Sequence, residues 1–356
     1  MTTLGVTQAN TPGTDLEVQE VVEETADARS FILSVPADRR EQFRYRAGQF
    51  LTIRVPLPGG PVARCYSLAS APRTDPQLKI TVKRTVGGAA SGWLVDNGVP
   101  GLLLRSLRPA GTFTLRDRPG DVVLFAAGSG ITPVIAIAKE ALAAADRRVR
   151  LFYANRDAES TIFRDELLRL EDLHGGRFGL DLWFEGDHAG VPGVDDVASF
   201  VEQCADGQHL LCGPSPFMDV VFQGLGKAGV PANAIHSERY ETTSAYPFAP
   251  PAVPGSGAEP IGDANVSQVE VTLDGRTTRH DWPRNRVLID VLLDAGIDAP
   301  YSCREGNCSA CACVVLNGAV EMRNNMVLDD ADIADGLVLG CQAVPLDDEV
   351  RVSFDA

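Results

Sequence analysis

The amino-acid sequence predicts a multidomain protein made of an antiparallel β-barrel, an α/β domain with a parallel sheet, and a small domain around a cysteine-rich loop. Residues 16–115 hold short strands and turns, with apolar and polar positions alternating in residues 78–85. Residues 122–126 form an apolar strand that leads through a Gly-rich turn into a long helix. Residues 303–311 contain three cysteines, and Cys341 follows thirty residues later.

Length and charge limit the classes of protein to consider. The 356 residues suffice for two or three domains, and a hydrophobic fraction of 44% supplies a core for each. The net charge of −16 argues against nucleic-acid binding, which depends on clustered Lys and Arg. Residues 267–356 carry 16 acidic and 7 basic residues. This acidic surface either attracts a basic partner or serves solubility alone.

No segment indicates secretion or membrane insertion. Residues 1–15 are polar, lack the pattern of a signal peptide and are expected to form an N-terminal tail. The longest uncharged run, residues 122–138, is shorter than the roughly 20 apolar residues that cross a bilayer. We therefore expect a cytoplasmic monomer that binds no membrane, in which eight cysteines suit metal ligation better than disulfides.

The barrel is expected over residues 16–118. Within it lies the string Arg64-Cys65-Tyr66-Ser67, followed some twenty residues later by a G-x-x-S-x-x-L pattern that starts at Gly88. Taken alone, Arg64 is equally well a surface charge and Tyr66 a core aromatic. The pairing of the two patterns makes a binding role more probable than either pattern does by itself.

The α/β domain is expected over residues 119–241. Thr132 suits the N-cap of the helix that follows the Gly-rich turn, and Pro133 suits its first position. Further strand–helix units at residues 149–170 and 209–225 support a parallel sheet. Asp157, after the second strand, would repel a 2′-phosphate, which favours NADH over NADPH if a dinucleotide binds here.

Residues 242–266 are rich in Pro, Gly and Ala and are expected to form a semi-rigid linker to a domain at 267–356. The spacing C-x4-C-x2-C with a distant fourth cysteine is the arrangement that holds a plant-type [2Fe–2S] cluster. Gly306 lets the loop turn, because a residue without a Cβ adopts positive φ freely. Structural zinc and disulfides remain as weaker alternatives. The predicted ligands are Cys303, Cys308, Cys311 and Cys341, whereas Cys65, Cys204 and Cys313 are expected not to bind the cluster.

Several motifs resemble those of the ferredoxin–NADP reductase superfamily joined to a plant-type ferredoxin domain of α+β (β-grasp) fold. Over its whole length the chain resembles reductase components of bacterial multicomponent oxygenases, above all those of 3-ketosteroid 9α-hydroxylase and then of phenylacetyl-CoA epoxidase. Many such cluster loops have Gly where this chain has Ser309. The resemblance is carried by A-R-C-Y-S-L at 63–68, V-K-R-T at 82–85, A-A-G-S-G-I-T-P at 126–133, Y-A-N-R-D at 153–157 and C-R-E-G at 303–306.

The resemblance implies roles for individual residues. Arg64 would neutralise a flavin phosphate, Tyr66 would pack on the isoalloxazine ring, and Ser67 would lie near its N5 atom. The Cys212-Gly213-Pro214 turn would lie beside the nicotinamide, and Glu238 and Tyr240 near the flavin, which makes Ser67, Cys212 and Glu238 the catalytic candidates. Further cofactor-binding residues implied in this way are Val82, Lys83, Gly88, Ala89, Ala90, Ser91, Gly128, Gly130, Thr132, Pro133, Asn155 and Arg156.

These sites together imply an NAD(P)H-dependent reductase. A nicotinamide gives up two electrons at once and a [2Fe–2S] cluster accepts one at a time. A flavin between them can accept the pair and pass the electrons on singly. The expected cofactors are FAD, with FMN as the less favoured choice, the cluster, and NADH. The expected partner is a separate terminal oxygenase, most readily a Rieske-type enzyme. A reductase for a di-iron monooxygenase, a self-contained oxidase and a redox sensor are the alternatives.

Overall fold

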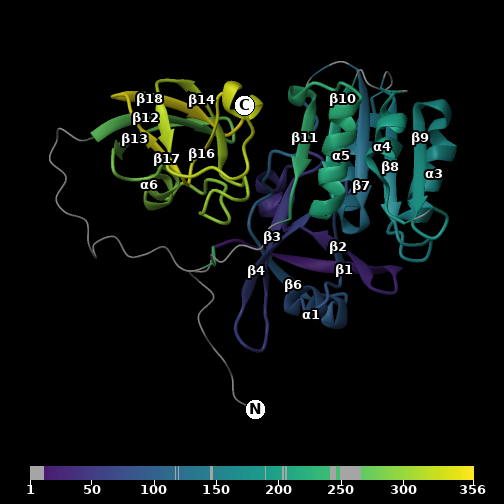
Figure 1. Cartoon of the computed structure of the whole chain (residues 1–356). Helices are drawn as coiled ribbons and strands as arrows, with labels where there is room; N and C mark the ends of the chain where they lie inside the picture. Colours follow the sequence, from purple (N-terminus) through teal and green to yellow (C-terminus); the bar gives the residue numbers. More distant parts are fainter. Residues whose placement is uncertain are drawn as a thin grey trace, which may run out of the picture. The chain divides into compact units, whose positions relative to one another are not determined.

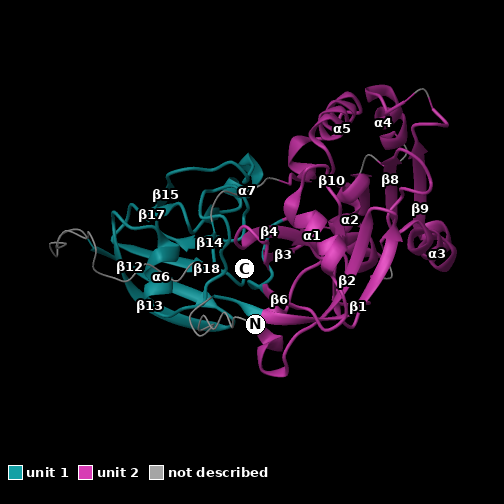
Figure 2. Cartoon of the chain, turned by 90° about the horizontal axis from the view of Figure 1, so that it is seen from below, with its two compact units in different colours: residues 1–14, 106–112, 241–356 teal, residues 15–105, 113–240 magenta. Residues whose placement is uncertain are grey.

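The structure is a computed structural model that describes residues 12–116, 118, 120–144, 147–188, 190–202, 204, 207–240, 246–248 and 266–356. The chain forms two compact units (Figure 2). The barrel–nucleotide unit consists of residues 15–105 and 113–240, and the C-terminal unit of residues 1–14, 106–112 and 241–356. Most of the expected N-terminal tail and linker lies outside the described residues. Among the described residues, no helix is both long and apolar enough to span a bilayer.

The first part of the barrel–nucleotide unit is a six-stranded antiparallel sheet in the order β4-β3-β6-β1-β2-β5 (Figure 1). A bridge between Leu68 and Ile80 joins the ends of the two edge strands, so the sheet closes into a barrel. Alternate side chains of the strands fill its core, among them Phe31, Leu51 and Ile53. The elements are β1 (Thr14–Thr25), β2 (Ala28–Ser34), β3 (Phe50–Val55), β4 (Val62–Ser67), β5 (Leu78–Lys83), α1 (Ala89–Asn97) and β6 (Leu103–Ser106).

The second part of the same unit is a five-stranded parallel sheet in the order β11-β10-β7-β8-β9. Helices α2 and α3 cover one face of this sheet, and α4 and α5 pack together on the other (Figure 1). The strands are β7 (Asp121–Ala127), β8 (Val149–Asn155), β9 (Phe178–Phe184), β10 (Gly207–Cys212) and β11 (Ile235–Glu238). The helices are α2 (Ile131–Leu142), α3 (Arg164–His174), α4 (Val194–Val201) and α5 (Ser215–Lys227).

One hydrophobic cluster contains side chains of both the barrel and the α/β domain. Val122 and Leu124 of β7 face α2, whereas Val123 and Phe125 face α4 and α5, as the two-residue period of a strand requires. The outer side of α2 packs against small side chains of the barrel and against Phe113. Every residue of α2 except Glu140 is therefore buried.

One expected feature of α2 is wrong. Thr132 is not the N-cap, because the residues Gly128–Gly130 form a 3₁₀ turn that brings the chain into the helix earlier, with Gly130 at the N-cap. Thr132 lies inside the first turn and donates its hydroxyl to the Ser129 carbonyl at 3.1 Å. Pro133 also lies in this first turn, where its missing N–H leaves no helical bond unmade.

A buried ion network ties α2 to the barrel. The Lys139 ammonium, 5% exposed, lies 2.7 Å from an Asp75 oxygen and 3.0 Å from a Glu166 oxygen. Lys79 of β5 approaches the second Glu166 oxygen at 2.9 Å and lies over the Phe163 ring, 4.6 Å from its centroid. Burial alone would raise the pKa of Glu166, but Lys139 and Lys79 outweigh it and hold the pKa below its usual value.

The C-terminal unit contains a five-stranded mixed sheet in the order β13-β12-β18-β14-β16 and a two-stranded sheet of β15 and β17. β12 and β18 are parallel and their other pairings are antiparallel, around a core that contains Trp282, Leu288 and Leu292. Its elements are β12 (Val266–Leu273), β13 (Arg276–Pro283), α6 (Leu288–Asp294), β14 (Ala312–Asn317), β15 (Val320–Met322), α7 (Asp330–Ala334), β16 (Leu337–Leu339), β17 (Ala343–Pro345) and β18 (Glu349–Ser353).

Part of the expected linker is packed within the C-terminal unit. Phe248 is 2% exposed, and the Tyr301 hydroxyl donates to the Pro247 carbonyl at 3.1 Å. Tyr246 contacts Phe248 with ring centroids 5.8 Å apart. The remainder of the expected linker, residues 242–245 and 249–265, lies outside the described residues. The expectation that residues 242–266 form a linker stays a prediction.

We predict that Lys139→Met lowers the free energy of unfolding by about 3 kcal/mol, because it leaves the partly buried Asp75 carboxylate without its cation and Glu166 with Lys79 alone. The matched control is Arg44→Met, since Arg44 and its partner Glu41 are both largely exposed; it should change stability by less than about 0.5 kcal/mol. Urea denaturation of the flavin-loaded protein measures both. Equal midpoints for the two variants would contradict the assigned role of Lys139.

The Lys139–Glu166 ion pair predicts that the stability of the fold depends on pH. The pKa of Glu166 is lowered in the folded state. Its contribution to the free energy of unfolding is therefore present above the ordinary pKa of a glutamate and is lost as pH falls through the pKa of the folded state. The difference in the free energy of unfolding between the wild type and Lys139→Met should therefore become smaller as the pH is lowered.

Candidate functional site

Strand β4 carries the first group of expected site residues. The Arg64 guanidinium donates to the Ala63 carbonyl at 2.7 Å and is half-buried, and burial raises the pKa of Tyr66 above its usual value. Ser67 ends the strand and is 3% exposed. On the neighbouring β5, the Val82 side chain lies in the barrel core, so only its main chain is available to a ligand, and Lys83 lies 3.9 Å from an Asp27 oxygen.

Helix α1 begins with main-chain donors that no side chain of the helix caps. Its N-cap is Gly88, and Ala89 and Ala90 follow in the first turn. The Ser91 hydroxyl instead holds the preceding turn, because it accepts from the Thr85 N–H at 3.0 Å and donates to the Gly88 carbonyl at 3.2 Å. The start of α1 therefore fits a phosphate group, which binds the free N–H groups of a helix N-terminus.

The Gly-rich turn between β7 and α2 is fixed by two neighbours. The Tyr153 hydroxyl of β8 donates to the Gly128 carbonyl at 3.0 Å. A Cβ on Gly130 would lie 2.1 Å from the Cys212 carbonyl oxygen, so no other residue fits where these two turns meet. The Cys212-Gly213-Pro214 turn, which leads from β10 into α5, is thereby held against the Gly-rich turn.

The end of β8 offers a second set of polar groups. Asn155 is 6% exposed, and its buried amide nitrogen has no hydrogen-bond partner in the part of the chain that the structure describes. Arg156 is exposed and bonds to Asp157 at 3.0 Å. Hydrogen bonds from the Ser160 side chain and main chain, and then from Arg156, lower the pKa of Asp157 to about 2, so this exposed carboxylate is charged at neutral pH.

Five expected residues meet where the barrel joins the α/β domain. The Ser67 hydroxyl donates to a Glu238 carboxylate oxygen at 3.3 Å and lies 3.2 Å from the Tyr240 hydroxyl. The Tyr240 hydroxyl also bonds to Thr132 at 2.9 Å. Cys212 lies opposite Glu238 in the β10–β11 register and is fully buried. The structure thus brings together all three catalytic candidates.

The surroundings of this junction favour neutral side chains. Glu238 is half-buried, and desolvation by the adjoining strands raises the pKa of its carboxyl group to about 8, against the opposing bond from Ser67. Burial, and secondarily the Glu238 charge, raises the pKa of Cys212. Tyr240 as a residue is 48% exposed, but its hydroxyl lies within hydrogen-bonding distance of buried Ser67 and Thr132, and desolvation raises the pKa of this hydroxyl as well. At pH 7 the side chains of Glu238, Cys212 and Tyr240 are therefore protonated, and Cys212 is a thiol rather than a thiolate.

The cysteine-rich loop gathers the four expected ligands. Cys303 lies within hydrogen-bonding reach of Cys308 and Cys341, and Cys341 within reach of Cys311. Gly306 has φ 83°, the left-handed conformation that the loop requires. All eight cysteines lie among the described residues and are free thiols. Cys313 points into the domain core and is 3% exposed.

Main-chain N–H groups surround these sulfur atoms. Cys303 Sγ accepts from the N–H groups of Glu305 at 3.4 Å and Asn307 at 3.3 Å, and Cys311 Sγ accepts from Cys341 at 3.3 Å. Side-chain hydrogen bonds from Cys308 and Cys341, with the two main-chain donors, lower the pKa of Cys303. Thiolates stabilised by N–H donors are the ligands of iron–sulfur clusters, and this donor set fits one.

Ser309 has a role that the spacing of the cysteines does not predict. Its φ is 51°, a conformation that favours glycine, and its hydroxyl accepts from the Thr112 N–H at 3.3 Å. In the same unit, Arg108 donates to both carboxylate oxygens of Asp274 at 2.7 and 2.8 Å and to the Asp298 carbonyl at 2.9 Å. The departure from Gly at Ser309 was the sequence signal for this contact; nothing in the sequence indicated the Arg108 bonds.

Comparison with known proteins follows the same division of the chain. An "Oxidoreductase FAD-binding domain" model matches residues 15–115, an "Oxidoreductase NAD-binding domain" model residues 124–223, and a "2Fe-2S iron-sulfur cluster binding domain" model residues 271–346. These matches confirm the expected cofactor classes, including FAD and the cluster.

Relatives match almost end to end. The ferredoxin reductase component of 3-ketosteroid-9-alpha-monooxygenase from Rhodococcus rhodochrous is 47% identical, covering 95% of this chain and 96% of its own. A component of 1,2-phenylacetyl-CoA epoxidase from Escherichia coli is 32% identical, covering 96% and 97%. The structure of phthalate dioxygenase reductase matches with TM-score 0.56 and 26% identity over 96% of this chain and 98% of that chain. The three-part fold and the reductase assignment are thereby confirmed, and the chain belongs to the family of NAD(P)H-dependent oxygenase reductases that carry FAD-binding, NAD-binding and [2Fe–2S] domains on one chain.

Proposed function

We propose that this protein is the reductase component of a 3-ketosteroid 9α-hydroxylase system and passes electrons from NADH to a Rieske-type terminal oxygenase. The observation that carries this proposal is the 47% identity to such a component along nearly the whole chain. The 32% identity to a phenylacetyl-CoA epoxidase component makes a di-iron monooxygenase the second candidate. The bound groups supply hydride acceptance at the flavin and single-electron storage at the cluster.

The side chains of this protein hold and orient those groups. Arg64 and the start of α1 bind the flavin phosphates, and Tyr66 packs on its ring. The turns at Gly128 and Cys212 receive the nicotinamide half of the dinucleotide. Asn155, whose amide nitrogen has no partner among the described residues, ends β8, and the charged Asp157 follows it. The adenosine ribose of NADH would bind here, and Asp157 would repel a 2′-phosphate. Glu238 holds a proton on its carboxyl group near Ser67.

The assignment is tested by reconstitution. The purified protein is combined with the terminal oxygenase of a 3-ketosteroid 9α-hydroxylase and, in parallel, with the oxygenase components of phenylacetyl-CoA epoxidase. We expect hydroxylated steroid from the first mixture only, and at least a tenfold higher kcat/KM for NADH than for NADPH, equivalent to about 1.4 kcal/mol. Epoxide formation without steroid hydroxylation would reverse the order of the two candidates.

The proposed partner presents a basic surface to the acidic C-terminal domain. Residues 267–356 hold 16 acidic and 7 basic residues, and opposite charges accelerate encounter at long range. Electron transfer in the productive mixture should slow as salt is added, because exposed charges are screened beyond about 8 Å at physiological ionic strength. We also propose that the protein is a monomer, which equilibrium sedimentation tests.

Glu238 makes the NADH-dependent reduction of ferricyanide depend on pH. Its carboxyl group has a pKa of about 8, so it is neutral at pH 7 and ionises as pH rises through that value. A negative charge there opposes the charge that arrives with a hydride, so kcat/KM should fall over this range. Glu238→Gln should keep the rate at pH 7 and lose the inflection. An unchanged inflection in Glu238→Gln would assign the titration to another group.

The four cysteine ligands predict a simple contrast. Cys341→Ser should lose most of its iron and visible absorbance, because three thiolates hold the cluster poorly. Cys313→Ser, a buried neighbour that faces the core, should keep full iron per protein even where stability falls. Iron analysis and the visible spectrum of both purified variants measure this. Full iron in Cys341→Ser would refute the ligand set.

A further inference from the structure

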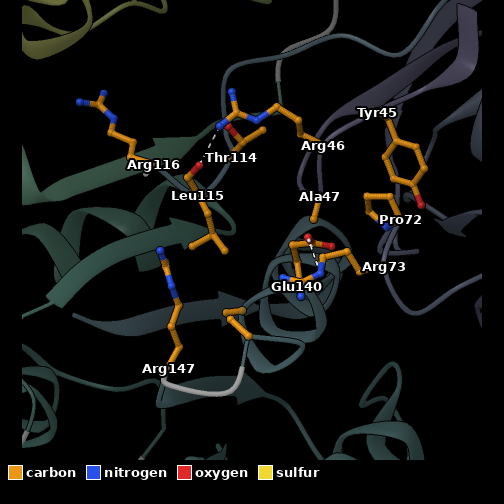
Figure 3. Close-up of a pocket in the computed structure, with 12 residues that line it drawn as sticks. Tyr45, Arg46, Ala47, Pro72, Arg73, Thr114, Leu115, Arg116, Glu140 and Arg147 are labelled. Carbon is orange, nitrogen blue, oxygen red and sulfur yellow. Dashed lines mark hydrogen bonds and ion pairs between the residues drawn. The ribbon is translucent and has the colours of Figure 1, made fainter. Parts of the chain in front are cut away.

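A cavity of about 320 Å³ lies between the barrel and the last turn of α2, within the barrel–nucleotide unit (Figure 3). Small buried side chains, Ala47 and Ala141, line part of it. Arg46 and Arg73 come from the barrel side, and Arg147 follows α2. Figure 3 shows Arg73 against Glu140 and Arg147 extending toward Leu115. The cavity is thus formed by two domains that are joined by one hydrophobic cluster.

The cavity is strongly cationic in a protein of net charge −16. Four arginines are among the residues that line it, Arg46, Arg73, Arg116 and Arg147, whereas Glu140 is the one acidic residue among the described lining residues. Arg73 Nε lies 3.8 Å from that carboxylate. The lining therefore carries an excess of positive charge, to which the C-terminus of α2 opposes only about half a negative charge.

Hydrogen bonds hold three of these side chains in place without neutralising them. Arg46 donates to the Leu115 carbonyl at 2.9 Å, Arg73 to the Ala143 carbonyl at 3.1 Å and Arg147 to the Arg118 carbonyl at 3.0 Å. A guanidinium has five N–H donors, so each retains donors for a ligand. Carbonyls are neutral, and the arrangement therefore preorganises charge around the cavity.

Two buried atoms at the cavity have no hydrogen-bond partner among the residues that the structure describes. They are Arg147 Nη1, a donor, and Glu140 Oε2, an acceptor. Buried polar atoms are rarely left unpaired, because each costs about 1–3 kcal/mol. Because both atoms are buried in this structure, a ligand reaches them only when the two side chains turn toward the cavity. Such a ligand would present an oxyanion to the arginine and a hydroxyl group to the glutamate.

The cavity is separate from the proposed dinucleotide site. Gly128–Gly130 precede the first residue of α2, whereas Glu140 and Ala141 lie in its last turn. At 1.5 Å per residue, the two ends of α2 are about 15 Å apart. A nicotinamide dinucleotide held at the Gly-rich turn therefore leaves this cavity open to a second ligand.

From these observations we propose that the cavity is a binding site for a small phosphate ester that carries a hydroxyl group. A dianionic phosphate matches the excess of positive charge better than a monocarboxylate does, and it offers several acceptor oxygens to planar guanidinium groups. The ligand contacts both the barrel and α2, so its binding stabilises their association in the folded protein.

Isothermal titration of the FAD- and cluster-loaded protein, saturated with NAD⁺ and at constant ionic strength, tests the site. Ribose 5-phosphate is the probe, and ribose and inorganic phosphate are the comparisons. We expect one site for ribose 5-phosphate with Kd below about 1 mM, weaker binding of inorganic phosphate, and no binding of ribose. Absence of saturable binding, or equal affinity for inorganic phosphate, would overturn the assignment to a hydroxylated phosphate ester.

Two variants and one control locate the binding. Arg147→Met should weaken ribose 5-phosphate binding about tenfold, whereas Glu140→Gln should tighten it, because the one negative charge is removed while an acceptor oxygen is kept. Arg148→Met is the control, since Arg148 is exposed and does not line the cavity. The opposite signs separate a charge effect from misfolding. Equal loss in Arg147→Met and Arg148→Met would show nonspecific attraction and sink the proposal.

Discussion

The burial of α2 on both sides is the constraint on which the barrel–nucleotide unit depends. One side of the helix packs on the parallel sheet and the other on the barrel, so only Glu140 of its residues escapes burial. Any displacement of α2 would expose apolar surface to water on both of these sides, at a cost of about 25 cal/mol per Å². The Gly-rich turn at the start of α2 and Lys139 in its second half are consequently held at fixed positions relative to the barrel strands.

The polar contacts of α2 complement this apolar packing. Near its start, Thr132 meets Tyr240, which in turn contacts Ser67 of the barrel. Further along, Lys139 joins Asp75 to Glu166. Dispersion and area burial are not directional, whereas these bonds fix the rotation of the helix about its axis. The junction that gathers Ser67, Cys212 and Glu238 depends on both kinds of interaction.

The fold and the main motifs could be predicted because their signals are local. Residues 78–85 alternate with a strand's period, and residues 122–126 run into a Gly-rich turn, so both elements were recognisable without tertiary information. Cysteine spacing alone identified the cluster loop. Strand β9 was not predicted, because most of its residues are only half-buried at the sheet edge and give a weak pattern.

Features that depend on distant pairs could not be predicted. Lys79 and Glu166 are 87 residues apart in sequence, and Arg108 and Asp274 are 166 apart. Neither pair produces a repeating pattern in the sequence, because each pair involves only one residue in each of two segments. Thr132 was misassigned for a related reason: the 3₁₀ turn that brings the chain into the helix earlier lies against Cys212, a contact that only the folded chain reveals.

The contact between Gly130 and Cys212 also limits how this family can be recombined. A Cβ at Gly130 would lie 2.1 Å from the Cys212 carbonyl, so the backbone paths of the two turns are matched to within a fraction of an atomic radius. A chimera of two reductases with its crossover between β8 and β10 joins one parent's first turn to the other parent's second. Crossovers before β7 or after the Cys212 turn keep the matched pair from one parent, so a chimera made from this chain is expected to tolerate crossovers at the domain borders better than crossovers inside the α/β sheet.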